Sequence, residues 1–248
     1  MNCQEYYDEE GFVKFRELEL RRFENTLKFI QKTGSLIDIG CGLGYWLDFL
    51  NKKTSLDLQG GDISGEKLIH AQELHPKILF NEIDIRHLPY EDNSFDQVSC
   101  MEVLEHIPEW KQGLSELLRI SSKQVIITVP YDETLTTKVC GSCKSEAHLY
   151  GHINSFLEKD FQDFNSLGKL SFEYLAPPFS FNEYLTKAFN SFLGFKQKDY
   201  SSNGHTQAII CPNCYDRIPY SKLIPAEKRL KRSLTSKPEN LVVIIERN

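Results

Sequence analysis

Short apolar runs alternate with amphipathic segments through the first half of the chain. Runs of strand length lie at 36–39, 58–62, 80–85 and 125–130, and 94–107 is typical of a strand that runs into a helix. Strands that alternate with helices are typical of a parallel sheet covered on both faces. The sequence therefore predicts an α/β fold: a Rossmann-like, doubly wound, mostly parallel seven-stranded sheet.

Further elements are expected outside this region. Residues 12–31 carry apolar side chains at helical spacing, which predicts an amphipathic helix packed on the edge of the sheet. A helix is expected near 157–167, a turn followed by a strand within 168–175 and a last buried strand at 241–245. The long segment between the last two strands has no place in the sheet, so it is expected to form an insertion.

A glycine-rich turn follows the first strand. Gly40, Gly42 and Gly44 come directly after a run that ends in Asp38 and Ile39. Glycine has no Cβ, so the backbone of such a turn can lie close to a ligand. A dinucleotide-binding turn would need its third glycine at position 45, which is Tyr45. This displacement argues against NAD or FAD.

Aspartates also end the next two strands. Asp62 follows the second apolar run, where a carboxylate can accept hydrogen bonds from both hydroxyls of a ribose, and Asp84 lies near the end of the third. Each has a simpler explanation, because aspartate often caps helices and initiates turns. Their order and spacing together favour a nucleoside site.

These motifs resemble the class I S-adenosylmethionine-dependent methyltransferases, above all the small-molecule branch that includes the ubiquinone-biosynthesis O-methyltransferases. The match runs through 38–44, Asp62, 84–85 and 95–107. The resemblance implies that the glycines surround the methionine part, that Asp38 supports its amino group, that Asp62 holds the ribose and that Asp84 with Ile85 holds the adenine. The implied cofactor-binding set is Asp38, Gly40, Cys41, Gly42, Gly44, Asp62, Ile63, Asp84, Ile85, Met101 and Glu102.

The resemblance also divides the chain. Residues 1–33 are expected to form an N-terminal cap helix, and 34–130 the cofactor-binding core. Residues 131–240 would form an acceptor lobe that also carries sheet-completing elements near 157–176. Residues 241–248 would add the final core strand.

Four of the seven cysteines form two Cys-x-x-Cys pairs, Cys140 with Cys143 and Cys211 with Cys214. Two such knuckles are typical of a tetrahedral zinc site, and four thiolates leave no open position for water. We therefore expect one structural zinc ion in an inserted zinc-knuckle lobe that shapes an acceptor pocket. The alternatives are a redox dithiol, an iron–sulfur cluster, or two separate sites completed by histidines.

Methyl transfer to a hydroxyl benefits from a general base. The candidates are His106, which follows the fourth strand, and His148 and His152, which follow the fifth. We favour His152, although a helix-capping or zinc-supporting role is an alternative for it. The expected function is O-methylation of a small polar acceptor such as a sugar, a nucleotide sugar or a natural product. The acceptor class rests on the pathways in which similar zinc-knuckle chains occur, not on the residues.

Composition limits the alternatives. The chain has 248 residues, a formal net charge of −6 and no apolar run long enough to span a bilayer, and its first residues lack the pattern expected of a signal peptide. We expect a cytoplasmic protein, with oligomerisation possible, that binds neither membranes nor nucleic acid in general. N-methylation, methylation of protein or RNA, and a non-catalytic S-adenosylmethionine-binding protein with a zinc-built partner surface are the other functions considered.

Overall fold

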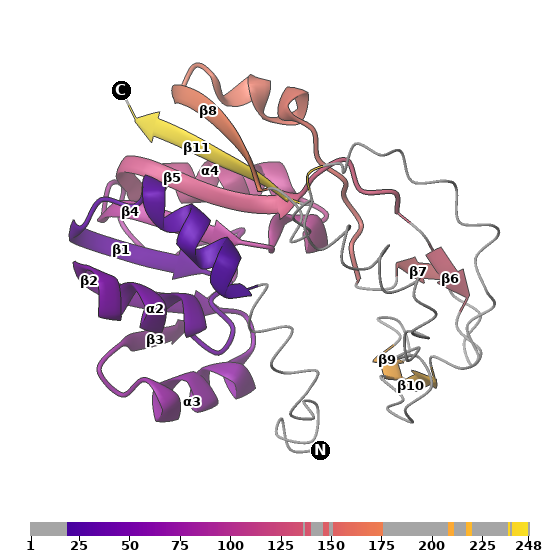
Figure 1. Cartoon of the computed structure of the whole chain (residues 1–248), viewed down its shortest axis with the longest axis horizontal. Helices are drawn as coiled ribbons and strands as arrows, with labels where there is room; N and C mark the ends of the chain where they lie inside the picture. The colour runs from indigo at the N-terminus through magenta and orange to yellow at the C-terminus, as the bar shows by residue number, and fades with distance from the viewer. Residues whose placement is uncertain are drawn as a thin grey trace, which may run out of the picture. The chain divides into compact units, whose positions relative to one another are not determined.

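The computed structural model describes residues 19–135, 151–175, 238 and 240–247, together with the backbone of four short strands. The chain divides into two units, and the larger comprises 15–135, 152–175 and 238–248. Its centre is a seven-stranded sheet with the order β3-β2-β1-β4-β5-β11-β8 (Figure 1). The predicted seven-stranded sheet is therefore confirmed.

The first five strands of the sheet are parallel. They are β1 (Thr33–Ile39), β2 (Ser55–Asp62), β3 (Leu79–Glu82), β4 (Phe95–Met101) and β5 (Ser121–Pro130). The connecting helices are α2 (Tyr45–Lys53), α3 (Gly65–Leu74) and α4 (Trp110–Ile120), with a 3-10 turn η3 (Leu104–His106) after β4. Strands β1 and β4 are neighbours in the sheet. The chain continues from β1 towards β2 on one side and from β4 towards β5 on the other, so the strand order reverses between them. Ligands bind in the crevice at such a switch point.

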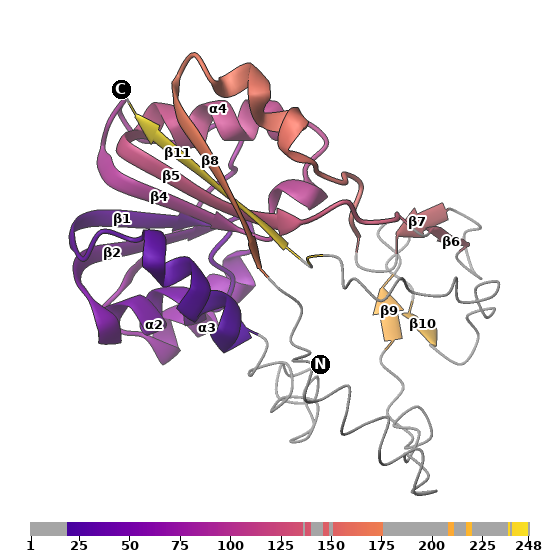
Figure 2. The same ribbon diagram turned by 45° about the horizontal axis from the view of Figure 1, so that its top comes forward.

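The last two strands of the sheet complete its other edge. Strand β11 (Asn240–Arg247) lies between β5 and β8 (Gly168–Leu175) and is antiparallel to both (Figure 2). A 3-10 segment, η4 (Glu158–Phe164), precedes β8 where a helix was predicted. The strand predicted within 168–175 corresponds to β8, and the predicted strand at 241–245 lies within β11.

Alternate side chains of the strands build two cores, one on each face of the sheet. One face packs against α4 and η4, through Leu114, Leu117, Phe161 and Phe164. The other packs against α2 and the helical residues 19–26, through Phe23, Trp46, Leu47 and Leu50. This double coverage explains why β5 and β11 are apolar at consecutive positions. Parallel sheets buried on both faces show such continuous runs.

The N-terminal helix is confirmed only in part, because the residues before 19 lie outside the described part of the chain. The smaller unit contains two antiparallel pairs of short strands. Strand β6 (Thr137–Val139) pairs with β7 (Glu146–His148), and β9 (Ala208–Ile210) pairs with β10 (Arg217–Pro219). Among the described helices, none combines the length and apolar character needed to cross a membrane.

Candidate functional site

The glycine turn after β1 adopts a conformation that side chains rarely take. Gly40, Gly42 and Gly44 have φ values of +83°, +55° and +77°. A Cβ on Gly40 would lie 2.3 Å from Val103 Cγ2, whereas a Cβ on Gly42 would meet nothing within 4 Å. Gly40 is therefore required by packing. Gly42 instead leaves open space above the turn.

Asp62 ends β2 next to this turn. Its Oδ2 accepts a 2.8 Å hydrogen bond from the Gly42 N–H, and its Oδ1 accepts one of 2.9 Å from the Ser64 N–H. Each carboxylate oxygen carries a second lone pair that can accept from a hydroxyl. The next side chain, Ile63, is 68% exposed, which gives a flat ring an apolar surface beside the carboxylate.

Asp38 lies beneath the turn and is almost fully buried. Its Oδ1 accepts a 2.6 Å hydrogen bond from Ser99 Oγ, and Ser99 Oγ in turn accepts one of 3.2 Å from Trp46 Nε1. Burial raises the pKa of Asp38 to about 7, with a smaller contribution from the Asp62 charge. A cation near Asp38 would favour its ionised form, which suits the role expected for it beside the amino group of the cofactor.

Asp84 has a partner within the chain. Strand β3 stops at Glu82, and the Asp84 carboxylate accepts hydrogen bonds from Arg86, including one of 2.6 Å from Nη2. These bonds lower the pKa of Asp84 to about 2. The Ile85 side chain is buried in the core and contacts α4 at Gly113. The expected adenine contact of Asp84 and Ile85 stays a prediction, and it requires Asp84 to bind a ligand in addition to Arg86.

Met101 and Glu102 lie at the carboxyl end of β4. Glu102 has a φ of +56°, a strained value for a residue with a side chain. Its Oε2 accepts a 2.8 Å hydrogen bond from Asn240 Nδ2 and lies 3.6 Å from Arg22 Nη1. These partners, from β11 and the N-terminal helix, hold the strained residue beside the glycine turn.

Three titratable side chains gather after β4 and β5. One ligand-type atom from each of Glu105, His106 and His152 lies within 4.8 Å of the others, and the two rings stand edge to face with centroids 4.8 Å apart. Glu105 is fully buried, and neither of its carboxylate oxygens has a hydrogen-bond partner among the described residues. Burial and the nearby Glu102 charge raise the pKa of Glu105.

The segment that carries His152 is held against η3 by hydrogen bonds. The N–H groups of Ile153 and Asn154 donate to the Glu105 carbonyl at 2.8 and 3.1 Å. Asn154 Nδ2 also donates to the carbonyls of Leu104 and Ile107. These bonds attach the segment to η3, and so two of the predicted histidines, His106 and His152, are brought together.

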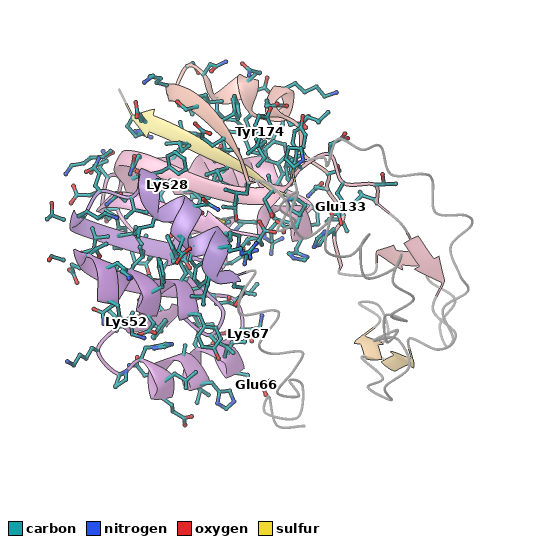
Figure 3. The ribbon with its side chains drawn as sticks, in the orientation of Figure 1. Lys28, Lys52, Glu66, Lys67, Glu133 and Tyr174 are labelled. Carbon is teal, nitrogen blue, oxygen red and sulfur yellow. The ribbon has the colours of Figure 1, made fainter. Side chains whose placement is uncertain are left out.

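A further carboxylate, Glu133, completes this cluster. Its Oε2 lies 2.6 Å from His152 Nδ1, and Figure 3 shows Glu133 beyond the carboxyl end of β5. The sequence offered no signal for this contact, because the two residues are far apart along the chain. Glu105 lies within the motif at 95–107, yet neither its complete burial nor the role of Asn154 could be read from the sequence.

The cysteines fall into two groups. Cys41 and Cys100 are free thiols, and burial raises the pKa of each above its usual range. Cys3, Cys140, Cys143, Cys211 and Cys214 lie outside the described residues. His148 ends β7, and its side chain also lies outside them. The expected zinc site therefore stays a prediction.

Comparison with known proteins finds similarity to methyltransferases. Residues 37–128 match the family described as methyltransferase domain. The chain is 26% identical over 170 residues to the chloroplastic tocopherol O-methyltransferase of Arabidopsis thaliana, covering 54% of this chain and 49% of that protein. It is 29% identical over 105 residues to norajmaline N-methyltransferase of Rauvolfia serpentina, covering 40% and 36%. This chain therefore spans about half, or less, of the length of these curated relatives.

A solved structure shares the fold over most of the chain. It is an S-adenosylmethionine-dependent methyltransferase from Mesorhizobium loti, with a TM-score of 0.56, 11% identity, and coverage of 92% of this chain and 98% of that one. The two proteins share an α/β fold with a Rossmann-like sheet. Residues 37–128 match the methyltransferase domain family, so this part of the chain is similar to the S-adenosylmethionine-dependent methyltransferases.

The residues present fit this cofactor. The open space over Gly42 would be filled by a Cβ in any other residue, and Asp62 with Ile63 offers a carboxylate and an apolar surface at the adjacent strand end. Asp38 supplies a buried carboxyl group for a cationic partner.

Proposed function

We propose that this chain transfers the methyl group of S-adenosylmethionine to a hydroxyl of a small polar acceptor, with His152 as the general base. The proposal that the chain binds S-adenosylmethionine rests on one observation. The Gly42 N–H donates a 2.8 Å hydrogen bond to Asp62 Oδ2 at the open turn. It joins the carboxyl ends of β1 and β2, so one carboxylate both shapes the turn and is available to a ribose.

S-adenosylmethionine supplies an electrophilic methyl group on its sulfonium. The chain binds it through the glycine turn, orients its ribose with Asp62 and pairs its amino group with Asp38. Holding two reactants in line contributes up to ~7–11 kcal/mol in well-oriented systems. The structure supports this role, since the turn is held by backbone and carboxylate bonds.

The acceptor half of the proposal rests on the histidine pair. His152 and His106 lie after β5 and β4, whose carboxyl ends are at the ligand-binding edge of the sheet. A neutral imidazole in this position would take the proton that a hydroxyl loses during methyl transfer. The predicted alternative His148 stays open, because its side chain lies outside the described residues.

Two alternatives keep the same cofactor site. An amine acceptor is favoured by similarity to norajmaline N-methyltransferase, and a hydroxyl by similarity to tocopherol O-methyltransferase. The histidine pair supports oxygen, because a hydroxyl is a weak nucleophile until its proton is removed, whereas a neutral amine is nucleophilic with its protons in place. A sugar or nucleotide-sugar acceptor stays a narrower prediction.

We also propose one structural zinc ion held by Cys140, Cys143, Cys211 and Cys214. Support comes from the strands around these cysteines. The first pair lies in the sequence between the antiparallel strands β6 and β7, and the second between β9 and β10. In both pairs of strands the first cysteine directly follows the first strand. The second cysteine lies three positions before the second strand in both cases. Matching hairpins with Cys-x-x-Cys at the turn are the usual frame of a zinc knuckle.

Calorimetric titration tests the cofactor. The protein should bind S-adenosylhomocysteine and give no heat with NAD.

A turnover assay tests the acceptor. Formation of S-adenosylhomocysteine from S-adenosylmethionine is measured with a panel of phenols, sugars, nucleotide sugars and amines. Turnover with a hydroxyl acceptor that falls about 10²–10⁴-fold in His152→Ala, without loss of S-adenosylhomocysteine affinity, is the expected result for a general base. Cofactor binding with no turnover on any acceptor would support the non-catalytic alternative.

A further inference from the structure

The Glu133–His152 pair has the geometry of a carboxylate that orients a base. The Glu133 Oε2 to His152 Nδ1 distance is 2.6 Å, and the two side chains are only 24% and 13% exposed. An ionised carboxylate can only accept a hydrogen bond, so the hydrogen of this contact belongs to Nδ1. The neutral ring then keeps Nε2 as its basic nitrogen. The hydrogen bonds made by the two ring nitrogens determine which of them carries the proton.

Both residues are fixed by neighbouring backbone. Residue 131, just after β5, forms a bridge with Phe156, and the Asp132 N–H donates to the Phe156 carbonyl at 2.9 Å. On the other side of His152, Ile153 and Asn154 bond to η3. The two segments that carry the pair are therefore tied to each other and to the sheet. A pair held in this way is organised before any acceptor arrives.

A second carboxyl group lies close to the ring. The buried Glu105 carboxyl group, which lacks a hydrogen-bond partner among the described residues, lies within 4.8 Å of the histidine pair. A proton taken by His152 would thus enter a site with two carboxyl groups nearby, Glu133 and Glu105. The Glu133 contact is in place before the proton moves, so it costs no reorganisation at that step.

We propose that Glu133 is the positioning residue of this enzyme: it holds His152 as the Nδ1–H tautomer, so that Nε2 receives the acceptor proton. This inference rests on the proposed function only for the use of the base. The tautomer itself is a property of the chain without an acceptor.

The test is two-bond ¹H–¹⁵N correlation spectroscopy on the full chain labelled with ¹⁵N in its seven histidines. The His152 signals are assigned by their loss in His152→Asn. In the parent chain the neutral His152 ring should carry its proton on Nδ1. In Glu133→Ala the major form should become the Nε2–H tautomer, because the acceptor at Nδ1 is gone. Glu133→Gln, which keeps an acceptor oxygen, should retain a larger fraction of the Nδ1–H form than Glu133→Ala.

Glu158→Ala is the matched control. Glu158 is a carboxylate of the same unit that accepts a hydrogen bond from the Tyr174 hydroxyl, and its loss should leave the His152 pattern unchanged. An Nε2–H tautomer in the parent chain, an unchanged pattern in Glu133→Ala, or an equal change in Glu158→Ala would each overturn the proposal. Binding of S-adenosylhomocysteine by the same samples verifies folding. Absence of binding in the parent chain would refute the proposed function, while the tautomer result would still decide the role of Glu133.

Discussion

The Gly42 N–H donates a 2.8 Å hydrogen bond to Asp62 Oδ2 and so joins the ends of two neighbouring strands. The same carboxylate caps the Ser64 N–H, which begins the turn into α3. One side chain therefore holds two backbone segments at the edge where the cofactor is expected.

Replacement of Asp62 by alanine should weaken S-adenosylhomocysteine binding. The variant loses charge-assisted hydrogen bonds, each of which contributes about 1.5–3 kcal/mol, so the dissociation constant should rise at least tenfold. Titration calorimetry measures it. Asp57→Ala, an exposed position on the same strand, is the control and should bind as the parent does.

Two glycines of the turn should respond differently to alanine. Gly42→Ala adds only the left-handed strain of about 1–2 kcal/mol, since its Cβ meets no atom within 4 Å among the described residues. Gly40→Ala adds a clash with Val103 and should cost about 1–3 kcal/mol more in unfolding free energy. Urea unfolding compares the two stabilities. Gly42→Ala should nevertheless lose S-adenosylhomocysteine affinity, and retention of full affinity would show that the open space does not hold the cofactor.

The raised pKa of Asp38 gives the stability a pH dependence. The folded pKa of about 7 lies above the unfolded value of about 3.9, so the folded state binds the proton more tightly. Its contribution is fully present below about pH 4 and is lost as pH rises towards 7. Unfolding free energy measured in urea without cofactor should show this fall. The fall should be smaller in Asp38→Asn, and an identical slope in the two proteins would contradict the assignment.

The zinc proposal predicts a metal content that depends on four cysteines. Protein purified without chelator should contain about one zinc per chain. Cys140→Ser and Cys214→Ser should lose the metal and unfold at lower temperature, because metal binding is coupled to local folding. Cys41→Ser and Cys100→Ser remove the two buried free thiols and should keep the zinc. Zinc that survives both knuckle substitutions would exclude a single shared site.

Much of the sheet could be predicted because its signals are local. Strand β8 lies in the segment 168–175 where a strand was predicted, and the glycine turn lies directly after β1. The third strand is shorter than the run at 80–85, because Asp84 turns back to accept the N–H and guanidinium bonds of Arg86. The run is apolar at Ile83 and Ile85 since both side chains reach the core from this turn.

The acceptor side was harder to predict, because its contacts join distant parts of the chain. Periodicity cannot show that Glu133 lies 2.6 Å from His152, or that Arg22 and Asn240 meet at Glu102. Burial decides the chemistry of Glu105, and burial at this position depends on how the segment at 151–156 packs on η3. Adjacent residues in the sequence carry the cofactor signal, whereas the proposed base depends on tertiary contacts.

The position of β11 has a consequence for synthesis of the protein. Residues 240–247 form the strand that separates β5 from β8, although β5 is complete by residue 130. During translation, β5 must remain an open sheet edge while more than a hundred further residues are made. Unpaired apolar edges recruit strands from other chains. Nascent chains should therefore depend on chaperones until the C-terminal strand leaves the ribosome, and expression should suffer most when that strand is altered.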